Sequence, residues 1–308
     1  MQENPELSII IVSYNVRQLL LNCIQSIIDT TAKIDYEIIV VDNASNDGGA
    51  QAVKERFPEL QVIANKENVG FASANNQGYA ISKGGFLLLL NPDTLVKPDA
   101  IKSVLDFIKS TPDAGMAGCR LLNPDGTLQK SICRFPSVLE HIGRAFFVDR
   151  FIFSEHRKGI YYRTKPFEID YCAGAFMMIR REALGNMPLL SPEFFMYAEE
   201  KDLALRLKEH DWKTYFVPQG EVIHFGEQST KQMAVEMFLE LQKSQVKFYA
   251  IHHKKFIAWL LSLSWGLVLI STWLISLPLL IFKRTHHRLK LLTIALLNYP
   301  KILKIVLK

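Results

Sequence analysis

The sequence has few cysteines, and their arrangement excludes a disulfide framework. Only four occur in 308 residues, at positions 23, 119, 133 and 172, and none forms a Cys-x-x-Cys pair. The first residues also lack the pattern of a secretory signal peptide. We therefore expect the cysteines to be reduced, unpaired and cytosolic.

A strong charge of one sign is also absent. The net charge is +5 and the pI about 8.9, and basic residues gather in the last sixty positions rather than in a stripe. This placement favours anionic lipid as a partner and argues against nucleic acid. With 49% hydrophobic and 22% charged residues, the chain can bury a core. Its length suits one catalytic domain of roughly 200 to 250 residues with an appendage.

The first part of the chain alternates short apolar runs with segments of helix length. The runs are Leu7–Ser13, Glu37–Asp42, Leu60–Ala64 and Phe86–Leu90. Such alternation predicts βαβ units, and continuous apolar runs are typical of strands covered on both faces. The expected fold class is α/β with a mainly parallel central sheet.

Beyond Gly118 the pattern is looser. Asn123-Pro-Asp-Gly126 predicts a turn, and residues 134–167 show no clean period. Regular patterns return in four segments further along the chain. The predicted elements are a strand at Ile169–Arg180, a helix at Glu199–His210, and strands at Trp212–Val217 and Glu221–Phe225.

Polar residues follow the apolar runs at the points where these stop. They occupy residues 13–15, 42–49 and 91–94, and residues 68–78 between them are rich in small side chains. Small residues let a backbone approach a ligand closely. Because a parallel sheet binds ligands outside the carboxyl ends of its strands, we expect these segments to form one site.

Two carboxylates in these segments have a chemical and a structural interpretation. Asp42 can accept a hydrogen bond from a base or ribose, and Asp93 can hold a divalent ion that bridges a diphosphate. Alternatively, Asp42 and Asp47 only cap the following helix, and Asn91-Pro-Asp93 is only a turn. Four polar clusters at four consecutive strand ends favour the ligand site.

Three carboxylates open the predicted helix at Glu199–His210. Glu199, Glu200 and Asp202 follow an aromatic-rich run at residues 194–197. The helix dipole favours acidic side chains in a first turn, which explains each of them structurally. Three acidic residues within four positions are more than the helix dipole requires. One of them can therefore be the base that takes a proton from an attacking hydroxyl.

Five segments together resemble glycosyltransferase family 2, in particular its rhamnosyltransferase-like branch. They are residues 8–15, 41–48, 68–71, 91–93 and 196–203, and the resemblance spans residues 7 to 228. It implies a GT-A fold, which is a Rossmann-like nucleotide-diphospho-sugar transferase domain. It also implies an inverting reaction and a divalent metal, Mn²⁺ or Mg²⁺.

The resemblance assigns roles to the residues of these segments. Asp42 would read the base or ribose, and Asp93 would be the metal ligand of an Asp-x-Asp-type motif. The first position of that motif is Asn91 here, a departure that weakens metal binding in principle and is familiar in this branch. The residues expected to bind the donor are Ser13, Tyr14, Asn15, Asp42, Asn68, Gly70, Asn91 and Asp93.

Glu200 falls where the family places its catalytic base, normally the Asp of a Glu-Asp pair. The longer side chain leaves Glu199 and Asp202 as alternatives. His224 resembles a histidine that completes the metal shell in related enzymes, although a lone histidine after a strand is more often structural. In the implied mechanism, Glu200 takes the acceptor proton and the oxygen attacks the anomeric carbon opposite the diphosphate, which inverts its configuration.

Three other functions are less compatible with the sequence. A processive polysaccharide synthase of this family carries a Gln-x-x-Arg-Trp motif and several membrane spans, and this chain has neither. A non-catalytic nucleotide- or glycan-binding module would not need these carboxylates and His224 together. A nucleotidyltransferase opens with a Gly-rich, basic phosphate loop, which is absent between Leu7 and Gln18.

The donor sugar is not specified by the sequence. The residues that choose it are expected within 120–190, where Asp170–Ala175 would approach the sugar and acceptor. The resemblance suggests a deoxythymidine-diphosphate (dTDP) or uridine-diphosphate (UDP) sugar, with rhamnose as the sugar.

Residues 256–282 contain no charged side chain. As a helix they would measure about 40 Å, against a hydrocarbon core of about 30 Å. Basic residues flank both ends, so a single crossing would conflict with the positive-inside tendency. A broken or re-entrant segment, with bends at Gly266 and Pro278, would keep both flanks beside the cytosol.

The predicted organisation is a catalytic domain over residues 1–250 and a membrane-attachment region over 251–308. The basic, leucine-rich tail at 289–308 suits a lipid surface. We therefore expect the protein at the cytoplasmic face of the inner or plasma membrane. A polyprenyl-diphosphate-linked glycan is the expected acceptor, and both a monotopic anchor and a single span remain open.

Overall fold

The computed structural model describes residues 4–145, 160–226, 234–277 and 283–307. The chain divides into two compact units. We call them the sheet unit (Met1–Arg134, Arg163–Phe195 and Glu199–Gln232) and the helical unit (Phe135–Tyr162, Met196–Ala198 and Met233–Lys308). The sequence placed a domain boundary at residue 250, whereas compact packing assigns three separate segments to the helical unit.

The four predicted amino-terminal strands form a parallel set in the sheet unit. They are β1 (Leu7–Ser13), β2 (Tyr36–Asp42), β3 (Gln61–Ala64) and β4 (Phe86–Leu90), in the spatial order β3-β2-β1-β4. The carboxyl ends of these strands therefore meet at one edge of the sheet. The prediction of a mainly parallel α/β sheet is confirmed.

The sheet continues as β10-β6-β11-β5. Strand β10 (Phe176–Arg180) is antiparallel to both of its neighbours, β4 and β6 (Ala114–Leu122), and β11 (Lys213–His224) is parallel to β6. Three short strands, β5 (Thr94–Val96), β7 (Ile132–Cys133) and β8 (Phe167–Ile169), complete the pairing together with β9 (Tyr171–Cys172). The antiparallel β10 thus separates two parallel groups of strands.

Two strand predictions are wrong in detail. Residues 169–180 form parts of three strands, because the backbone between β9 and β10 bonds to two other segments, Ser131 and Asn91. The two strands predicted at 212–225 are one strand, β11. Its register shifts between Val217 and Glu221, so a bulge accommodates Pro218 and Gly220 within one strand.

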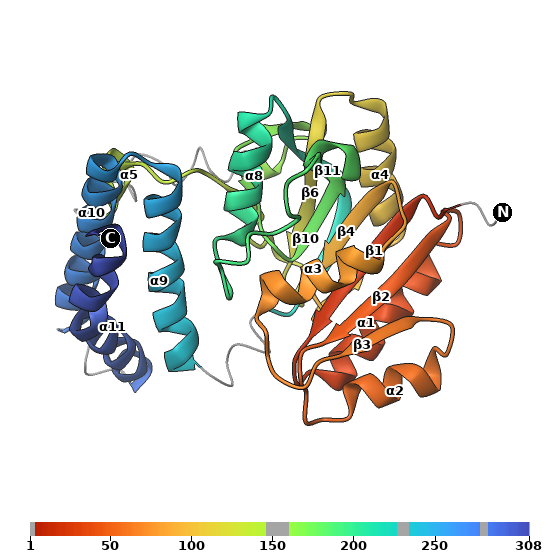
Figure 1. Cartoon of the computed structure of the whole chain (residues 1–308), viewed down its shortest axis with the longest axis horizontal. Helices are drawn as coiled ribbons and strands as arrows, with labels where there is room; N and C mark the ends of the chain where they lie inside the picture. Colours follow the sequence, from red (N-terminus) through yellow and green to blue (C-terminus); the bar gives the residue numbers. More distant parts are fainter. Residues whose placement is uncertain (1–3, 146–159, 227–233, 278–282, 308) are drawn as a thin grey trace. The chain divides into compact units, whose positions relative to one another are not determined.

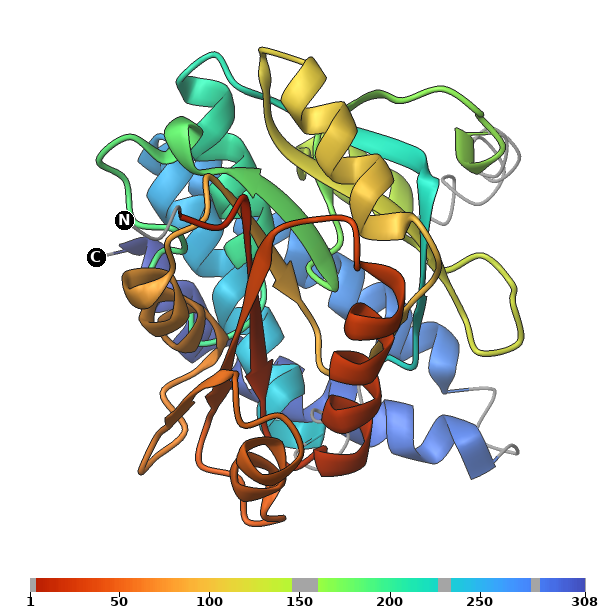
Figure 2. The ribbon, with the colours of Figure 1, turned by 90° about the vertical axis from the view of Figure 1, so that its right-hand side faces the viewer.

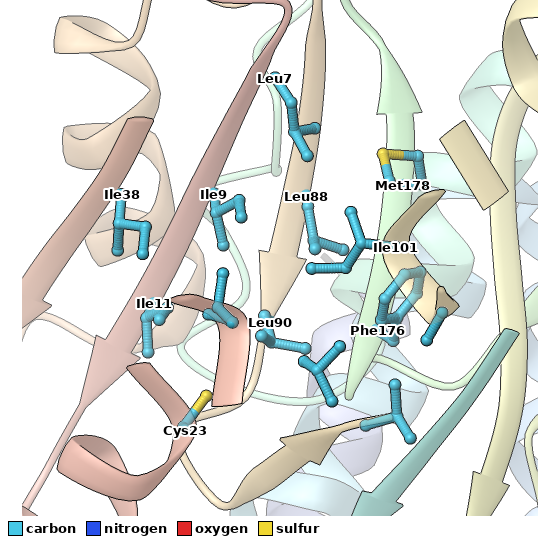
Figure 3. Close-up of a cluster of buried hydrophobic side chains, with 14 of the residues drawn as sticks. Leu7, Ile9, Ile11, Cys23, Ile38, Leu88, Leu90, Ile101, Phe176 and Met178 are labelled. Carbon is cyan, nitrogen blue, oxygen red and sulfur yellow. The ribbon is translucent and has the colours of Figure 1, made fainter. Parts of the chain in front are cut away.

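Helices cover both faces of the sheet. Helices α1 (Arg17–Thr30), α2 (Gly49–Arg56) and α4 (Ala100–Ser110) share a buried core with alternate residues of β1, including Ile9 and Ile11. Figure 3 shows this core. Ile10 points to the other face, where α3 (Phe71–Ile81) lies, and Figure 2 shows α3 opposite α1 and α4. Helix α8 (Glu199–Glu209) confirms the predicted helix and packs on β11.

The helical unit contains α5 (Val138–Ala145), α9 (Ala234–His252), α10 (Lys255–Ser276) and α11 (Lys283–Leu307), all labelled in Figure 1. Within the described ranges, α10 alone is long and apolar enough to cross a membrane, by length and composition. It runs through Gly266 without interruption, and the missing side chain there admits the ring of Tyr299. The predicted bend at Pro278 and the end of the apolar segment at 282 lie outside the described residues.

Candidate active site

Ser13 and Asp42 are neighbours at the carboxyl ends of β1 and β2. They are paired in the strand register, and both are almost fully buried. Asp42 Oδ2 accepts a hydrogen bond from the backbone of Ser45 at 3.0 Å, whereas Asp42 Oδ1 and Ser13 Oγ have no protein partner. Buried polar atoms are normally paired, because leaving one unpaired costs about 1–3 kcal/mol. These two atoms are therefore candidates for binding a ligand.

The loops after β1 and β2 hold each other in place. The backbone N–H of Asn15 donates to Ser45 Oγ at 2.9 Å, and Asn15 Oδ1 accepts from the backbone of Asn46 at 2.7 Å. Tyr14, which lies between Ser13 and Asn15 in the sequence, is half-buried. Asp47 accepts from the backbone N–H groups of Arg17 and Gly49, the first residues of α1 and α2. Asp47 therefore has the structural role, whereas Asp42 keeps an oxygen for a ligand.

Side-chain amides fix the loop that contains Asn68 and Gly70. Asn43 donates through Nδ2 to Asn68 Oδ1 at 2.7 Å, and the backbone N–H of Gly70 donates to the same oxygen at 3.0 Å. Gly70 has φ +87°, and a Cβ there would lie 2.5 Å from the carbonyl oxygen of Phe195. The glycine is thus required for this loop to pack against the segment that leads to α8.

Asn91, Asp93 and His224 lie together at the ends of β4 and β11. His224 is paired with Thr94 in the β11–β5 register, which brings it beside the loop after β4. His224 Nε2 lies 3.3 Å from Asp93 Oδ1 and 3.4 Å from Asn91 Nδ2. The structure therefore brings together the two predicted metal ligands, which are 131 positions apart in the sequence.

Gln129 determines which nitrogen of His224 carries the proton. Its Nε2 donates to the backbone oxygen of His224 at 3.2 Å and to Asn123 Oδ1 at 3.0 Å. Its Oε1 is therefore the acceptor for His224 Nδ1, at 2.6 Å. A neutral ring with its proton on Nδ1 has a lone pair on Nε2. That lone pair and the Asp93 carboxylate face each other, an arrangement that a cation stabilises.

Asp93 and His224 fit a divalent ion of the Mn²⁺ type, which accepts carboxylate oxygen and imidazole nitrogen. Within the residues that the structure describes, no group of three or more His, Cys, Asp or Glu side chains could hold a metal ion. The pair can therefore supply two ligands, and a metal bound here would take the others from substrate or water.

The loop between β9 and β10 connects this pair to α8. The backbone carbonyl of Ala175 accepts from the N–H of Asn91 at 3.1 Å. Its neighbour Gly174 lies beside Glu200, since a Cβ on the glycine would be 4.0 Å from Glu200 Cβ. Residues 170–175 thus run from the His224 pair to the carboxylates at the start of α8.

The three carboxylates of α8 have different surroundings. Asp202 is 1% exposed as a side chain and forms an ion pair with Arg206 at 2.8 Å. Arg206 also donates to the carbonyls of Pro188 and Leu189, so this pair anchors α8 to the preceding loop. Glu199 is buried and Glu200 is half-buried. Of the three, Glu200 is the side chain with the most access to solvent.

Burial changes the ionisation of the residues around Glu200. It raises the pKa of Glu199 well above 4.5, and the adjacent negative charge of Glu200 raises it further. Glu199 Oε2 also has no hydrogen-bond partner. Burial lowers the pKa of Lys201 to about 8, although the two glutamates oppose this change. Burial therefore favours the protonated form of Glu199, and that form cannot act as a base.

Left-handed backbone conformations occur beside the predicted site residues. Asn15 and Ala44 have φ of 53° and 67°, and Tyr197 and Ala198 have φ of 68° and 73° directly before α8. Such conformations are costly for non-glycine residues and are often found at functional sites. The loops that hold the candidate site are thus constrained by strain as well as by hydrogen bonds.

Sequence reasoning did not identify Gln129, Arg206 or Asn43. Gln129 follows the predicted 123–126 turn, but nothing in the local pattern shows that the chain returns to His224. Arg206 lies one helical turn after Asp202, a spacing that does indicate an ion pair. Asn43 directly follows Asp42 and was included only as part of the 42–49 segment.

Comparisons with known proteins identify the family. The model of the family described as "Glycosyl transferase family 2" matches residues 8–187. The chain is 27% identical over 246 residues to an N-acetylglucosaminyl-diphospho-decaprenol L-rhamnosyltransferase of Mycobacterium tuberculosis, which covers 75% of this chain and 79% of the relative. It is 26% identical over 223 residues to the rhamnosyltransferase WbbL of Escherichia coli, with 70% and 82% covered.

A solved structure shares the fold at low sequence identity. The mannosyltransferase PcManGT from Pyrobaculum calidifontis, in complex with GDP-Man and Mn²⁺, matches with a TM-score of 0.60 and 16% identity. The match covers 97% of this chain and 88% of that one. At this identity the likeness supports the fold, which is GT-A.

Proposed function

This chain belongs to glycosyl transferase family 2, and we propose that it transfers a sugar, rhamnose in the simplest case, with inversion at the anomeric carbon. The donor is a dTDP- or UDP-sugar, and the acceptor is a hydroxyl of a polyprenyl-diphosphate-linked glycan. The observation that carries the proposal is the Asp93–His224 pair, at the same sheet edge as the unpaired buried atoms of Ser13 and Asp42. The curated relatives named as rhamnosyltransferases support the choice of sugar.

The strand-end residues bind the donor. Asp42 Oδ1 and Ser13 Oγ, which have no partner in the protein, would bond to the base or ribose. Tyr14 lies in the same segment, and the amide network around Asn68 and Gly70 keeps the neighbouring loop in place. This network is preorganised, so donor binding requires little ordering of these loops.

Asp93 and His224 would hold a divalent metal, with Asn91 beside them. When bound, Mn²⁺ or Mg²⁺ would neutralise the negative charge of the diphosphate leaving group. Gln129 accepts a hydrogen bond from Nδ1 of His224, so the neutral ring presents the lone pair of Nε2 to a metal. Asn91 donates toward the same nitrogen and takes the position of the first carboxylate in the Asp-x-Asp-type motif.

Glu200 is the catalytic base of the proposed reaction. Asp202 forms an ion pair with Arg206, and burial raises the pKa of Glu199 and favours its neutral form, so Glu200 is the carboxylate best suited to take the acceptor proton. The half-buried Glu200 lies beside Gly174, where an added Cβ would be 4.0 Å from Glu200 Cβ. The acceptor oxygen can then attack the anomeric carbon as its proton passes to Glu200.

The site of action is the cytoplasmic face of the membrane. The relative from Mycobacterium tuberculosis is named for a decaprenol-linked substrate, and α10 is long and apolar enough to interact with lipid. A lipid-linked acceptor and a nucleotide-sugar donor meet at that surface. The protein would therefore act in the synthesis of a cell-envelope polysaccharide.

A transfer assay with the full-length chain tests the proposal. Purified protein is incubated with dTDP-rhamnose or a panel of UDP-sugars, a polyprenyl-diphosphate-linked N-acetylglucosamine and Mn²⁺, and the product is identified by mass spectrometry. We expect one donor to be used, and its transfer to stop when EDTA removes the metal. NMR of the product should show the anomeric configuration opposite to that of the donor. If no nucleotide-sugar binds and none is turned over, the proposal fails.

The metal ligands have a readout besides activity. Calorimetry of Mn²⁺-dependent nucleotide diphosphate binding is expected to weaken in Asp93→Asn and in His224→Ala. Asp35→Asn, at an exposed position of the sheet unit, serves as the matched control. Unchanged Mn²⁺ dependence in both ligand variants would show that the metal, if needed, binds elsewhere.

A further inference from the structure

One face of α10 exposes large apolar side chains. Phe256, Trp259, Leu267, Ile270 and Leu274 recur at helical spacing, and between 41% and 66% of each residue is exposed. We call these five residues the α10 stripe. A contiguous exposed apolar surface of this kind marks a place where another surface binds.

The exposed face of the neighbouring helix α11 is basic. Its buried face consists of Leu292, Ala295, Tyr299, Ile302 and Val306, at spacings of three and four residues. Its exposed residues include His286, Lys290, Lys301 and Lys304, with Leu297 among them. After Glu240 the sequence has eleven lysines and arginines and no aspartate or glutamate. The partner that complements this region is anionic.

Contacts within the helical unit place charged residues beside the middle of α10. The hydroxyl of Tyr299 donates to the carbonyl of Ser262 at 2.6 Å, and the Tyr299 ring packs where Gly266 lacks a side chain. Lys301 is two residues further along α11, which is about 3 Å along its axis. Lys301 therefore lies level with the central part of α10 rather than with its ends.

Helix α9 also places charged side chains beside the middle of α10. Trp265 Nε1 donates to Gln242 Oε1 at 2.8 Å. Lys243 is adjacent to Gln242 in sequence and pairs with Glu240 at 3.3 Å. If α10 crossed a bilayer, these charges and Lys301 would lie close to its midplane, where ionised side chains are strongly unfavourable.

We propose that the helical unit binds one leaflet of an anionic membrane without crossing it. The α10 stripe enters the interface between headgroups and acyl chains, and the lysines of α11 contact the headgroups. This inference deepens the proposed function, on which it rests for the location of the acceptor. A second copy of the chain is disfavoured as the occupant of the stripe, because two such basic regions would repel each other.

Vesicle binding by the full-length chain tests the stripe without donor or acceptor. The wild type is expected to co-sediment with vesicles of phosphatidylcholine and phosphatidylglycerol. Leu267→Glu with Leu274→Glu should lower the bound fraction by about tenfold or more, because each carboxylate would have to enter the interface. Ile81→Glu, at an exposed apolar residue of α3, is the matched control and should bind normally. Circular dichroism confirms that the variants are folded, and Leu267→Gln with Leu274→Gln should show a smaller loss.

Charge dependence tests the basic helix. Lys301→Gln with Lys304→Gln is expected to weaken binding to the anionic vesicles by about fivefold per lysine and to leave binding to pure phosphatidylcholine unchanged. Added salt should reduce the difference. Lys33→Gln with Lys54→Gln, two exposed positions of the sheet unit, should have little effect.

The orientation of α10 is tested by labelling in sealed inner-membrane vesicles whose cytoplasmic face is outside. The vesicles are prepared from cells that express the protein. Cysteines are introduced by Lys254→Cys before α10 and by Lys290→Cys on α11. We expect a membrane-impermeant maleimide to label both from the cytoplasmic side, with no gain after detergent. Protection of one position until detergent is added would show that α10 spans the bilayer and would overturn the inference.

Two further results would also overturn it. Binding to vesicles that does not change with the stripe variants would place the lipid contact elsewhere. A dimer in light scattering that dissociates in the Leu267→Glu, Leu274→Glu variant would assign the stripe to a second copy. All of these measurements are independent of sugar transfer, so a failed transfer assay would leave their outcome intact.

Discussion

The two units of the molecule treat buried polar side chains differently. In the sheet unit, Ser13, Asp42 and Glu199 each keep a buried oxygen without a protein partner. In the helical unit, His141 bonds to Ser264 and Tyr249 through its two ring nitrogens. Unpaired buried atoms are costly, and those of Ser13, Asp42 and Glu199 lie at the candidate site. Others lie away from it, at Thr31 Oγ1 in the sheet unit and at His253 Nε2 in the helical unit. The comparison indicates that the candidate site gathers polar atoms suited to a ligand, whereas His141 uses both of its ring nitrogens to join helices of the helical unit.

The largest expected effect is on catalysis in the sheet unit. Glu200→Gln keeps the size of the side chain and removes its ability to accept a proton. A positioned base contributes about 10²- to 10⁴-fold, so we expect kcat to fall by that factor with donor affinity retained. Transfer kinetics and calorimetric donor binding measure the two quantities.

Glu199→Gln is the matched control for that variant. Because burial raises the pKa of Glu199 and favours its neutral form, a neutral amide of similar shape should change kcat by less than about tenfold. A large loss in Glu199→Gln together with near-normal turnover in Glu200→Gln would reverse the assignment of the base.

The second prediction concerns the close approach of the Gly70 loop to Phe195. Gly70→Ala adds a Cβ 2.5 Å from a backbone oxygen at φ +87°, and we expect about 3 kcal/mol of lost stability. Gly126→Ala has a similar φ of +80° with nothing within 4 Å, and should cost about 1 kcal/mol. Urea unfolding of both variants isolates the steric part. Equal losses would show that the backbone conformation alone requires glycine at position 70.

The third prediction is a pH dependence of the stability of the sheet unit. Glu199 has a pKa above 4.5 in the folded state, so its contribution is full below the unfolded pKa and is lost as the pH rises through the folded pKa. This group should lower the free energy of unfolding by about 1.4 kcal/mol per pH unit in that window.

The comparison is made between pH 5 and pH 7, below the range in which Lys201 titrates. Urea unfolding of Glu199→Gln should show a smaller fall in stability than the wild type over this interval. Glu55→Gln, at an exposed position of α2, should behave as the wild type. Parallel pH profiles of all three proteins would contradict the raised pKa of Glu199.

The smallest expected effect is in the helical unit. Tyr299→Phe removes the hydrogen bond to Ser262 and keeps the ring against Gly266, and should cost about 1 kcal/mol. Tyr162→Phe, at an exposed tyrosine of the same unit, should cost nothing measurable. Thermal unfolding followed by circular dichroism compares them. A loss above about 3 kcal/mol would mean that Tyr299 does more than join two helices.

Much of the sheet unit could be predicted from sequence, because its elements are local. The apolar runs gave the bounds of β1 and β4, and the polar residues that follow them lie together at one edge of the sheet. The helix with Glu199, Glu200 and Asp202 was also correct. Their different surroundings were not predictable, since burial depends on packing by residues far along the chain.

The missed features depend on long-range contacts. Gln129 contacts His224, which is 95 positions away. The sequence alone does not show which polar residue will lie beside that histidine. Likewise, α5 has eight residues and packs on α10, more than 100 positions later. A helix this short has little stability alone, so its sequence carries a weak pattern.

The helical unit is assembled from three segments of the chain, the last of which ends at Lys308. Synthesis proceeds from the amino terminus, so all segments of the sheet unit emerge from the ribosome before α10 does. Helix α5 must wait for α9 and α10 before its buried face is covered. The surface proposed to bind lipid is therefore complete only after α11 has been synthesised, later than every segment of the sheet unit.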